Sequence, residues 1–316
     1  MAEKIRHISL PERVIPLVML LSVMLASPKV LSQQNTQFTQ YISNELLVNP
    51  AYAGAEEALS ISLLSKAQWA GVDGAPNTQS LTAHSLIKSN KVGLGFTIVN
   101  DKIGIHSRIN ASSSFAYRLE LKQNTFLSFG LLAGISQEKS DFGSLSGQVQ
   151  NPNDPKLNST SLSQTNLEVG SGVYLITPRL NMGISMPNML YKNEPSDSIS
   201  SSLLNNNIFF IFRYSIPITN NFVLKPGLLM RYTNGLPLYM DINIATVVNN
   251  VLLVGISYRY KESINPIIQA KITPQFKIGY AFDYPIANES SFGSNSHEFM
   301  VSYLFSFSKH KVAELR

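Results

Sequence analysis

The chain of 316 residues contains no cysteine and little charge. Without cysteine there can be no disulfide, thiolate metal site, cysteine nucleophile or N-terminal lipid anchor on cysteine. Charged residues make up 14% of the sequence and hydrophobic residues 44%, so the charges are too few to cover a water-facing surface. No stretch approaches the roughly 20 consecutive apolar residues of a membrane helix, which excludes a helical-bundle membrane protein.

The N-terminal segment has the pattern of a secretory signal peptide. Lys4, Arg6 and Arg13 precede an apolar run over residues 14–26, and small residues follow before Gln33. We expect residues 1–32 to be removed by cleavage after Ser32, the alternative being a single N-terminal membrane anchor. Without this segment the formal charge falls from +5 to +3, an excess that gives no reason to expect nucleic acid as a partner.

Period-two alternation of apolar and polar residues recurs along the chain. From residue 276, Phe276, Ile278 and Tyr280 fall on one face of an extended segment, and Lys277 and Gly279 fall on the other. Residues 222–232 and 298–307 show the same split. Successive side chains of a strand point to opposite faces, whereas a helix would scatter these residues around its axis. The pattern predicts β-strands.

Alternation of this kind predicts an all-β, transmembrane outer-membrane β-barrel of about 14 antiparallel strands. Short and long connections alternate, as in outer-membrane barrels, whose even strand count leaves both termini in the periplasm. We divide the chain into a signal peptide (1–32), a periplasmic leader (33–56), the barrel (57–307) and a periplasmic C-terminal tail (308–316). The expected strands are 58–68, 77–87, 92–100, 107–121, 125–139, 166–176, 179–189, 207–218, 222–233, 238–248, 251–261, 265–272, 275–284 and 297–307.

In such a barrel the apolar face of each strand meets lipid and the other face lines the lumen. Charged residues on the second face either pair with one another and fill the barrel, or form a polar pore or a site for a peptide segment. The alternation places nine charged residues on the lumen face: Arg118, Glu120, Arg213, Lys225, Arg231, Arg259, Lys277, Asp283 and Glu298.

Two segments rich in aromatic, proline and glycine residues flank the first strand. Pro and Gly make turns, and the single Trp suits an interfacial anchor, so both segments have a structural explanation. Their pattern does not decide whether the leader lies in the barrel or docks on a periplasmic partner. The candidate partner-binding residues are Asn49, Pro50, Tyr52, Gly54, Gln68, Trp69, Gly71, Gly74 and Pro76.

These segments carry a family resemblance. QFTQYISNELLVNPAYAG (37–54), QWAGVDGAPNTQS (68–80) and GSNSHEFMVSYLF (293–305) resemble the PorP/SprF family of Bacteroidetes outer-membrane proteins associated with the type IX secretion system. The resemblance runs from the leader to the last strand. One departure is local: an Arg is common before the Gln-Trp pair in this family, and here Lys66 and Ala67 precede Gln68.

The resemblance implies a non-enzymatic barrel without cofactors that helps to export or retain a large surface protein, typically an adhesin used in gliding or attachment. Other secretion components and outer-membrane lipid are the further partners that it implies. Our hypothesis is that the barrel holds the C-terminal sorting domain of its client through the lumen or the outer loops. The alternative is a diffusion channel or hydrophobic-solute transporter, since fold does not fix function.

No catalytic or metal site is expected. The histidines after residue 32 lack the i, i+4 spacing and acidic neighbours of a zinc site, and residues 151–158 lack the order of an EF-hand calcium loop. An outer-membrane phospholipase would need a Ser and a His together on the lipid-facing wall. His84 and Ser85 are adjacent on a strand and therefore point to opposite sides.

Overall fold

The computed structural model describes residues 37–56, 58–87, 91–145, 161–189, 207–286 and 295–305. Its strands all belong to one antiparallel sheet. They are β1 (Leu59–Ala67), β2 (Asn77–Leu86), β3 (Val92–Ile103), β4 (His106–Lys122), β5 (Thr125–Ser140), β6 (Leu162–Ile176), β7 (Leu180–Met186), β8 (Asn207–Tyr214), β9 (Ile216–Pro217), β10 (Phe222–Thr233), β11 (Tyr239–Val248), β12 (Leu252–Arg259), β13 (Ser263–Lys271), β14 (Phe276–Pro285) and β15 (Ser296–Phe305).

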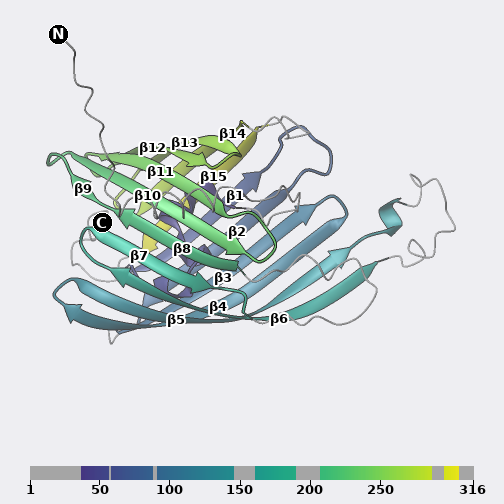
Figure 1. Cartoon of the computed structure of the whole chain (residues 1–316), viewed down its shortest axis with the longest axis horizontal. Coiled ribbons are helices and arrows are strands. Elements are labelled where there is room, and N and C mark those ends of the chain that lie inside the picture. The colour runs from purple at the N-terminus through teal and green to yellow at the C-terminus, as the bar shows by residue number, and fades with distance from the viewer. Residues whose placement is uncertain are drawn as a thin grey trace, which may run out of the picture.

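The sheet closes on itself. Each strand pairs with the next along the chain, except that β8 pairs with β10, and β1 pairs with β15, so no strand edge is left between them (Figure 1). Both β8 and β9 pair with β10 in one register, from Gly227 opposite Arg213 to Leu224 opposite Ile216. They count as one strand, which confirms the expected antiparallel barrel of 14 strands. Among the described residues, no helix is long and apolar enough to cross a membrane.

The break between β8 and β9 has a local cause. The shared register places Tyr214 opposite Pro226. Proline has no amide hydrogen to donate, so the hydrogen-bond ladder loses a rung at that position.

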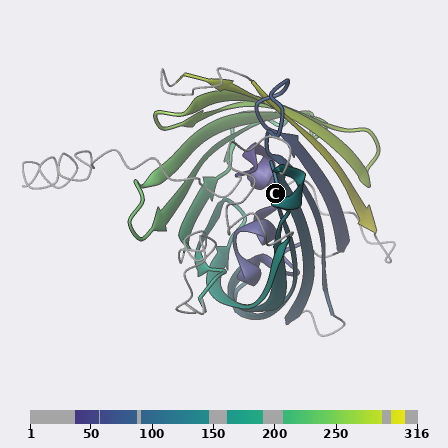
Figure 2. The same cartoon turned by 90° about the vertical axis from the view of Figure 1, so that its right-hand side faces the viewer.

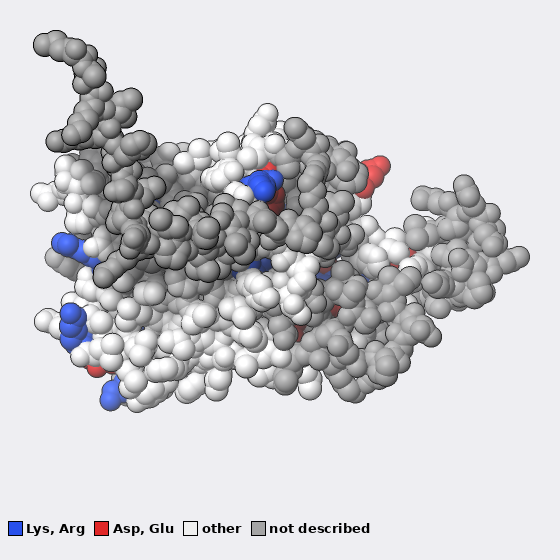
Figure 3. Space-filling view, viewed as in Figure 1, with Lys and Arg blue, Asp and Glu red and all other residues white. Residues whose placement is uncertain are grey.

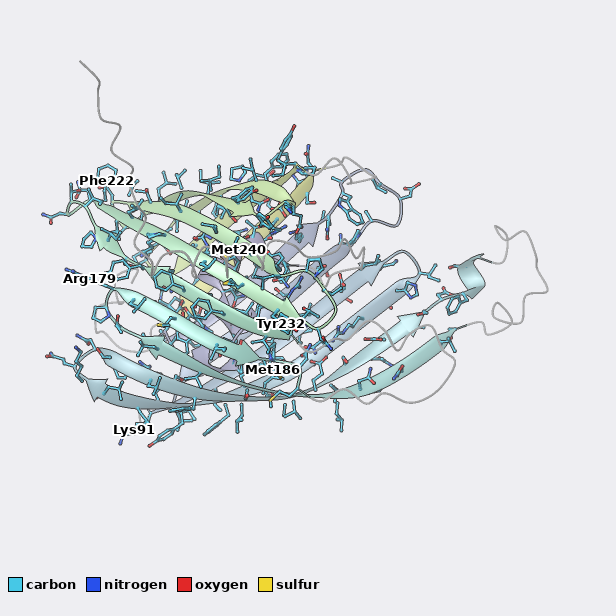
Figure 4. All side chains as sticks on the ribbon, in the orientation of Figure 1. Lys91, Arg179, Met186, Phe222, Tyr232 and Met240 are labelled. Atoms are coloured by element: carbon cyan, nitrogen blue, oxygen red, sulfur yellow. The ribbon has the colours of Figure 1, made fainter. Side chains whose placement is uncertain are left out.

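The two ends of the barrel differ in their connections. The short-turn end carries the turns after β4, β6, β9, β11 and β13, whereas the connections at residues 68–76 and 234–238 lie at the opposite end, which we call the long-loop end. Asn249 and Asn250 both have positive φ, at 51° and 54°, the backbone of the two-residue turn that suits the twist of a hairpin. In Figure 4, Lys91, Arg179 and Phe222 mark the short-turn end.

Several strands extend beyond their predicted limits. β3 ends at Ile103 and β4 begins at His106, so Gly104 and Ile105 alone connect them, where we expected a longer loop over residues 101–106. The signal peptide, residues 33–36, the possible calcium loop at 151–158 and the tail at 308–316 lie outside the described residues.

The outer surface of the wall is apolar. Large hydrophobic side chains are exposed along the strands, among them Leu131 at 62%, Leu167 at 74% and Phe299 at 57%. Where Figure 3 shows the wall in white, Lys, Arg, Asp and Glu are sparse and lie mostly toward the ends of the barrel. An exposed apolar band of this kind suits contact with lipid.

Candidate functional site in the barrel lumen

Residues 37–55, which we call the plug, lie inside the barrel. They contain three short 3-10 helices, η1 (Thr39–Ser43), η2 (Glu45–Leu47) and η3 (Pro50–Tyr52), and Figure 2 shows these helices enclosed by the strands. The sequence left open whether the leader lies in the barrel or docks on a periplasmic partner, and residues 37–55 lie in the barrel. The plug runs from the long-loop end, where Gln37 contacts Lys66, to the short-turn end, where Gly54 contacts Arg118.

The middle of the plug shares an apolar core with the wall. Tyr41, Leu46, Ala51 and Tyr52 are buried against wall residues that include Tyr174. The rings of Tyr52 and Tyr174 meet edge to face, with centroids 5.4 Å apart. Apolar side chains of the plug thus pack against apolar side chains that the wall points into the lumen, and this contact excludes water from both. The plug is therefore packed as a core element.

At the long-loop end, the plug completes a buried charge network. Lys66 Nζ lies 2.7 Å from Asp283 Oδ2, 4.0 Å from Glu298 Oε2 and 2.6 Å from the Gln37 carbonyl oxygen. The backbone N–H groups of Thr39 and Gln40 each donate to Glu298 at 2.8 Å. The Glu298 carboxylate thus accepts hydrogen bonds from N–H groups at the start of η1, which have no acceptor within the helix.

Arg259 extends this network around the lumen. Its guanidinium lies 3.3 Å from Asp283, 3.8 Å from Asp241 and 3.1 Å from Thr39 Oγ1. Tyr41 donates its hydroxyl to Asp241 at 3.2 Å and accepts from Asn243 at 2.6 Å. Burial, followed by the negative charge of Asp241, raises the pKa of Tyr41 well above its usual value, so the phenol stays a proton donor.

Further along the plug, Glu45 pairs with Arg213, which lies near the end of β8. Their charged atoms are 2.8 Å apart, and the hydroxyl of Tyr174 donates to the same carboxylate. Arg213 also donates to the carbonyl oxygen of Ile42 at 2.6 Å. A buried ion pair needs such additional hydrogen bonds to offset the loss of water.

Wall side chains also bind the backbone of residues 48–54 of the plug. Ser185 donates to the carbonyl oxygen of Val48 at 2.6 Å, Ser128 to that of Ala51 at 2.7 Å and Arg118 to that of Gly54 at 3.0 Å. Asn49 caps η3 by accepting from the N–H of Ala51 at 2.9 Å, and its amide donates to wall carbonyl oxygens. These bonds fix the position of the plug backbone along the lumen.

Glycines in the wall make room for the plug. A Cβ built on Gly93 or Gly130 would come within 3.0 Å of the backbone of Ala53 or Ala51 of the plug, and one built on Gly279 would come within 3.0 Å of the Gln40 side chain. Because real Cβ atoms do not approach backbone so closely, the plug could not keep its place against a larger residue at Gly93 or Gly130. The sequence analysis missed this role: inward-facing glycine inside alternating strands was the available signal, and it indicates a close backbone approach.

The predicted lumen residues occupy different environments. Arg118, Lys225, Arg231, Arg259, Asp283 and Glu298 are buried, and Arg213 and Lys277 are half-buried. Glu120 has the inward parity but is exposed, two residues before β4 ends, because the wall no longer encloses it there. Several of the buried charges bond to the plug or pair with one another, as Glu298 and Arg259 do.

The predicted partner-binding residues form two separate groups. Asn49, Pro50, Tyr52 and Gly54 lie in the plug, whereas the residues from Gln68 to Pro76 form the connection between β1 and β2 at the long-loop end. There the N–H of Gln68 donates to the Pro76 carbonyl oxygen at 2.9 Å, that of Trp69 to Ser296 Oγ at 3.2 Å, and Gly71 and Gly74 take positive φ. The structure does not bring these two groups together.

Replacing Asn49 tests how strongly the plug supports the barrel. The Asn49 side chain is fully buried and donates to the carbonyl oxygens of Val173 at 3.1 Å and Ile184 at 3.4 Å. We expect Asn49→Ala to lower the free energy of unfolding by about 2 kcal/mol, because it removes a helix cap and leaves buried carbonyl groups unpaired. Urea unfolding of the folded barrel measures this change.

Asn77→Ala is the matched control for Asn49→Ala. Asn77 is exposed at the start of β2, and its replacement should change stability by no more than about 0.5 kcal/mol. Equal effects of the two substitutions would contradict a stabilising role for Asn49.

Two cavities remain beside the plug. The long-loop cavity, of about 180 Å³ for water-sized spheres, has Phe38, Leu47 and Val48 of the plug and Asp101 and Arg108 of the wall in its lining. The short-turn cavity, of about 80 Å³, lies between Ile42, Ser43 and Tyr52 of the plug and a wall that includes four cationic side chains. The plug therefore occupies the lumen without filling it completely.

Comparison with known proteins agrees with this architecture. A family model described as "Type IX secretion system membrane protein PorP/SprF" matches residues 30–303. No curated protein matches the chain.

Among solved structures, the Acinetobacter baumannii outer membrane protein Omp33 is 10% identical over 80% of this chain and 100% of its own, with a TM-score of 0.46. The CymD monoaromatic hydrocarbon channel is 12% identical over 89% of this chain and 96% of its own, with a TM-score of 0.49. The P. putida toluene transporter TodX is 9% identical over 83% of this chain and 94% of its own, with a TM-score of 0.48.

Proposed function

The chain belongs to the PorP/SprF family of type IX secretion system membrane proteins, and from this premise we propose that it assists the secretion and surface attachment of a large partner protein. The partner is a gliding or attachment adhesin, and the barrel holds its C-terminal sorting domain. The barrel acts by binding and performs no reaction. Translocation itself takes place through a separate channel.

The observation that supports this proposal best is the plug. Its backbone and side chains bond to strands on opposite sides of the lumen, such as β5 at Ser128 and β13 at Gln269. A lumen occupied in this way offers no free passage to a folded or extended client. The sequence left open whether the client is held in the lumen or at the outer loops. Because the plug occupies the lumen, we favour the long-loop end.

The long-loop cavity has the chemistry of a peptide site. Phe38 and Leu47 of the plug provide an apolar floor, and the rim includes the ion pair of Arg108 and Glu168, 2.7 Å apart. Peptide-binding clefts combine such an apolar surface with a few polar groups that fix orientation. Short turns of outer-membrane barrels face the periplasm, so this cavity would open toward the cell surface, where an exported client arrives.

A comparison of proteomes tests the proposed function. In a strain that lacks this protein, we expect one or two large proteins to disappear from the cell surface, with loss from the culture fluid as well if export itself fails. Quantitative mass spectrometry of both fractions measures this, and re-expression of the native chain should restore the pattern. An unchanged surface proteome would contradict the proposal and favour a solute channel.

Two variants locate the binding end in the same assay. Leu47→Asp places a charge on the floor of the long-loop cavity, and Arg179→Ala alters an exposed side chain at the short-turn end. We expect Leu47→Asp to reduce surface retention of the client while Arg179→Ala retains it, at equal barrel abundance in the membrane. The opposite order would place the binding surface at the short-turn end.

A further inference from the structure

The short-turn cavity carries a strong excess of positive charge. Arg213, Lys225, Lys271 and Lys277 line it, whereas Glu56 is the one carboxylate among its described lining residues. The charge of Arg213 is offset by Glu45, at 2.8 Å, so the excess rests on the three lysines. The three lysines come from β10, β13 and β14, so their side chains approach the cavity from different strands.

Lys225 is the least expected of these side chains. Its exposure is only 7%, and no hydrogen bond or ion pair joins its ammonium group to another residue in the part of the chain that the structure describes. A buried ammonium without a partner is costly because it has lost its water shell. The side chain is therefore arranged for a partner that is not part of the described chain.

The lysines also lie unfavourably with respect to one another. Lys271 and Lys277 are directly opposite in the pairing of β13 with β14, and like charges at such positions destabilise a sheet. Ser43, Asn243 and Gln269 add polar groups to the same lining. Repulsion among cations around a small polar cavity would be relieved by an anion bound between them.

We propose that the short-turn cavity is a binding site for a multivalent anion of the phosphate class. A carboxylate would offset one of the positive charges, whereas a phosphate group offsets up to two and offers acceptor oxygens in several directions. A volume of about 80 Å³ suits so compact a group. The phosphate is free in solution or belongs to a lipid headgroup, and both sources use the same contacts.

Isothermal titration of the purified full-length barrel in detergent with inorganic phosphate tests this site. We expect saturable binding, together with an increase in the thermal unfolding temperature that sodium chloride of equal ionic strength does not produce. The double variant Lys225→Met, Lys277→Met should bind phosphate at least about tenfold more weakly, since two charge-assisted contacts are lost. Without phosphate it should unfold no earlier than the native chain, because repulsion is removed.

Lys91→Met is the matched control, because Lys91 is an exposed lysine at the short-turn end outside the cavity. It should bind phosphate as the native chain does. Equal stabilisation by phosphate and chloride, or unchanged affinity in the double variant, would overturn the proposal.

Competition distinguishes the two sources. Detergent micelles doped with phosphatidic acid should displace inorganic phosphate if a headgroup reaches the cavity, and should leave the affinity unchanged if the site takes the free anion. Client export is not measured in these experiments, so their outcome is independent of the proposed secretion role.

Discussion

Deletion of residues 37–54 should turn the barrel from a closed structure into a conducting pore. The plug crosses the lumen from Gln37 to Gly54 and bonds to the wall at each level. Without it, polar and charged wall residues would surround a water-filled passage. In planar bilayers, we expect the native chain to give no resolved conductance steps and the deletion variant to give them.

A single substitution tests the same point in an otherwise complete chain. In Gly130→Val the new side chain occupies the place of Ala51, because even a Cβ at this position would come within 3.0 Å of it. The plug must then shift, and conductance steps should appear, fewer or smaller than those of the deletion variant. Gly134→Ala is the control, since a Cβ there meets Ala111 and Ser112 of the wall instead. A silent bilayer for both the deletion and Gly130→Val, with folded protein inserted, would refute the occlusion of the lumen by the plug.

The second large effect is expected from Lys66→Met. Lys66 is 2% exposed and bonds to Asp283 and to the plug at Gln37. Removing its ammonium takes a positively charged partner away from Asp283 and Glu298, and it also removes the hydrogen bond to Gln37 at the start of the plug. We expect a loss of about 3 kcal/mol in the free energy of unfolding, measured by urea titration of the folded barrel.

A double-mutant cycle assigns this loss to the ion pair. Asp283→Asn in the Lys66→Met background should cost less than Asp283→Asn alone, because the partner charge is already absent. Glu262→Gln is the control: Glu262 also pairs with Arg259, at 3.2 Å, but its side chain is 48% exposed, so its loss should cost at most about 1 kcal/mol. Equal costs of Lys66→Met and Glu262→Gln would contradict the importance of the buried network.

The two predictions concern one assembly. Lys66 belongs to the first strand, Asp283 and Glu298 to the last two, and the plug residues Thr39 and Gln40 bond to these carboxylates. The plug thus stabilises the place where the barrel closes. Loosening it should affect both conductance and stability, whereas a channel with an independent plug would lose only its occlusion.

Most of the barrel could be predicted from the sequence because strand alternation is a local signal. The face of each side chain follows from its parity alone, as for Phe276 and Lys277 on β14. Turn chemistry such as the pair Asn249 and Asn250 is likewise local. Parity does not decide burial, however: Glu120 has the inward parity but lies too near the strand end to be enclosed.

The candidate site could not be predicted in the same way. Residues 37–55 show no period that places one face inward, and their partners are far away in the chain: Thr39 bonds to Asp283 across 244 positions. Their aromatic, proline and glycine residues gave the family resemblance but not the location. For the same reason the sequence could not show that the plug engages the lumen charges.

The sequence by itself therefore determined the class of fold, the 14 strands and the faces of their side chains, because these depend on neighbours within a few residues. Only the tertiary structure decided that the leader fills the lumen, that wall glycines accommodate its backbone, and that Lys225, Lys271 and Lys277 meet at one cavity. These features depend on the closure of the sheet, which brings residues from distant strands around one enclosed space where charge and volume must be balanced together.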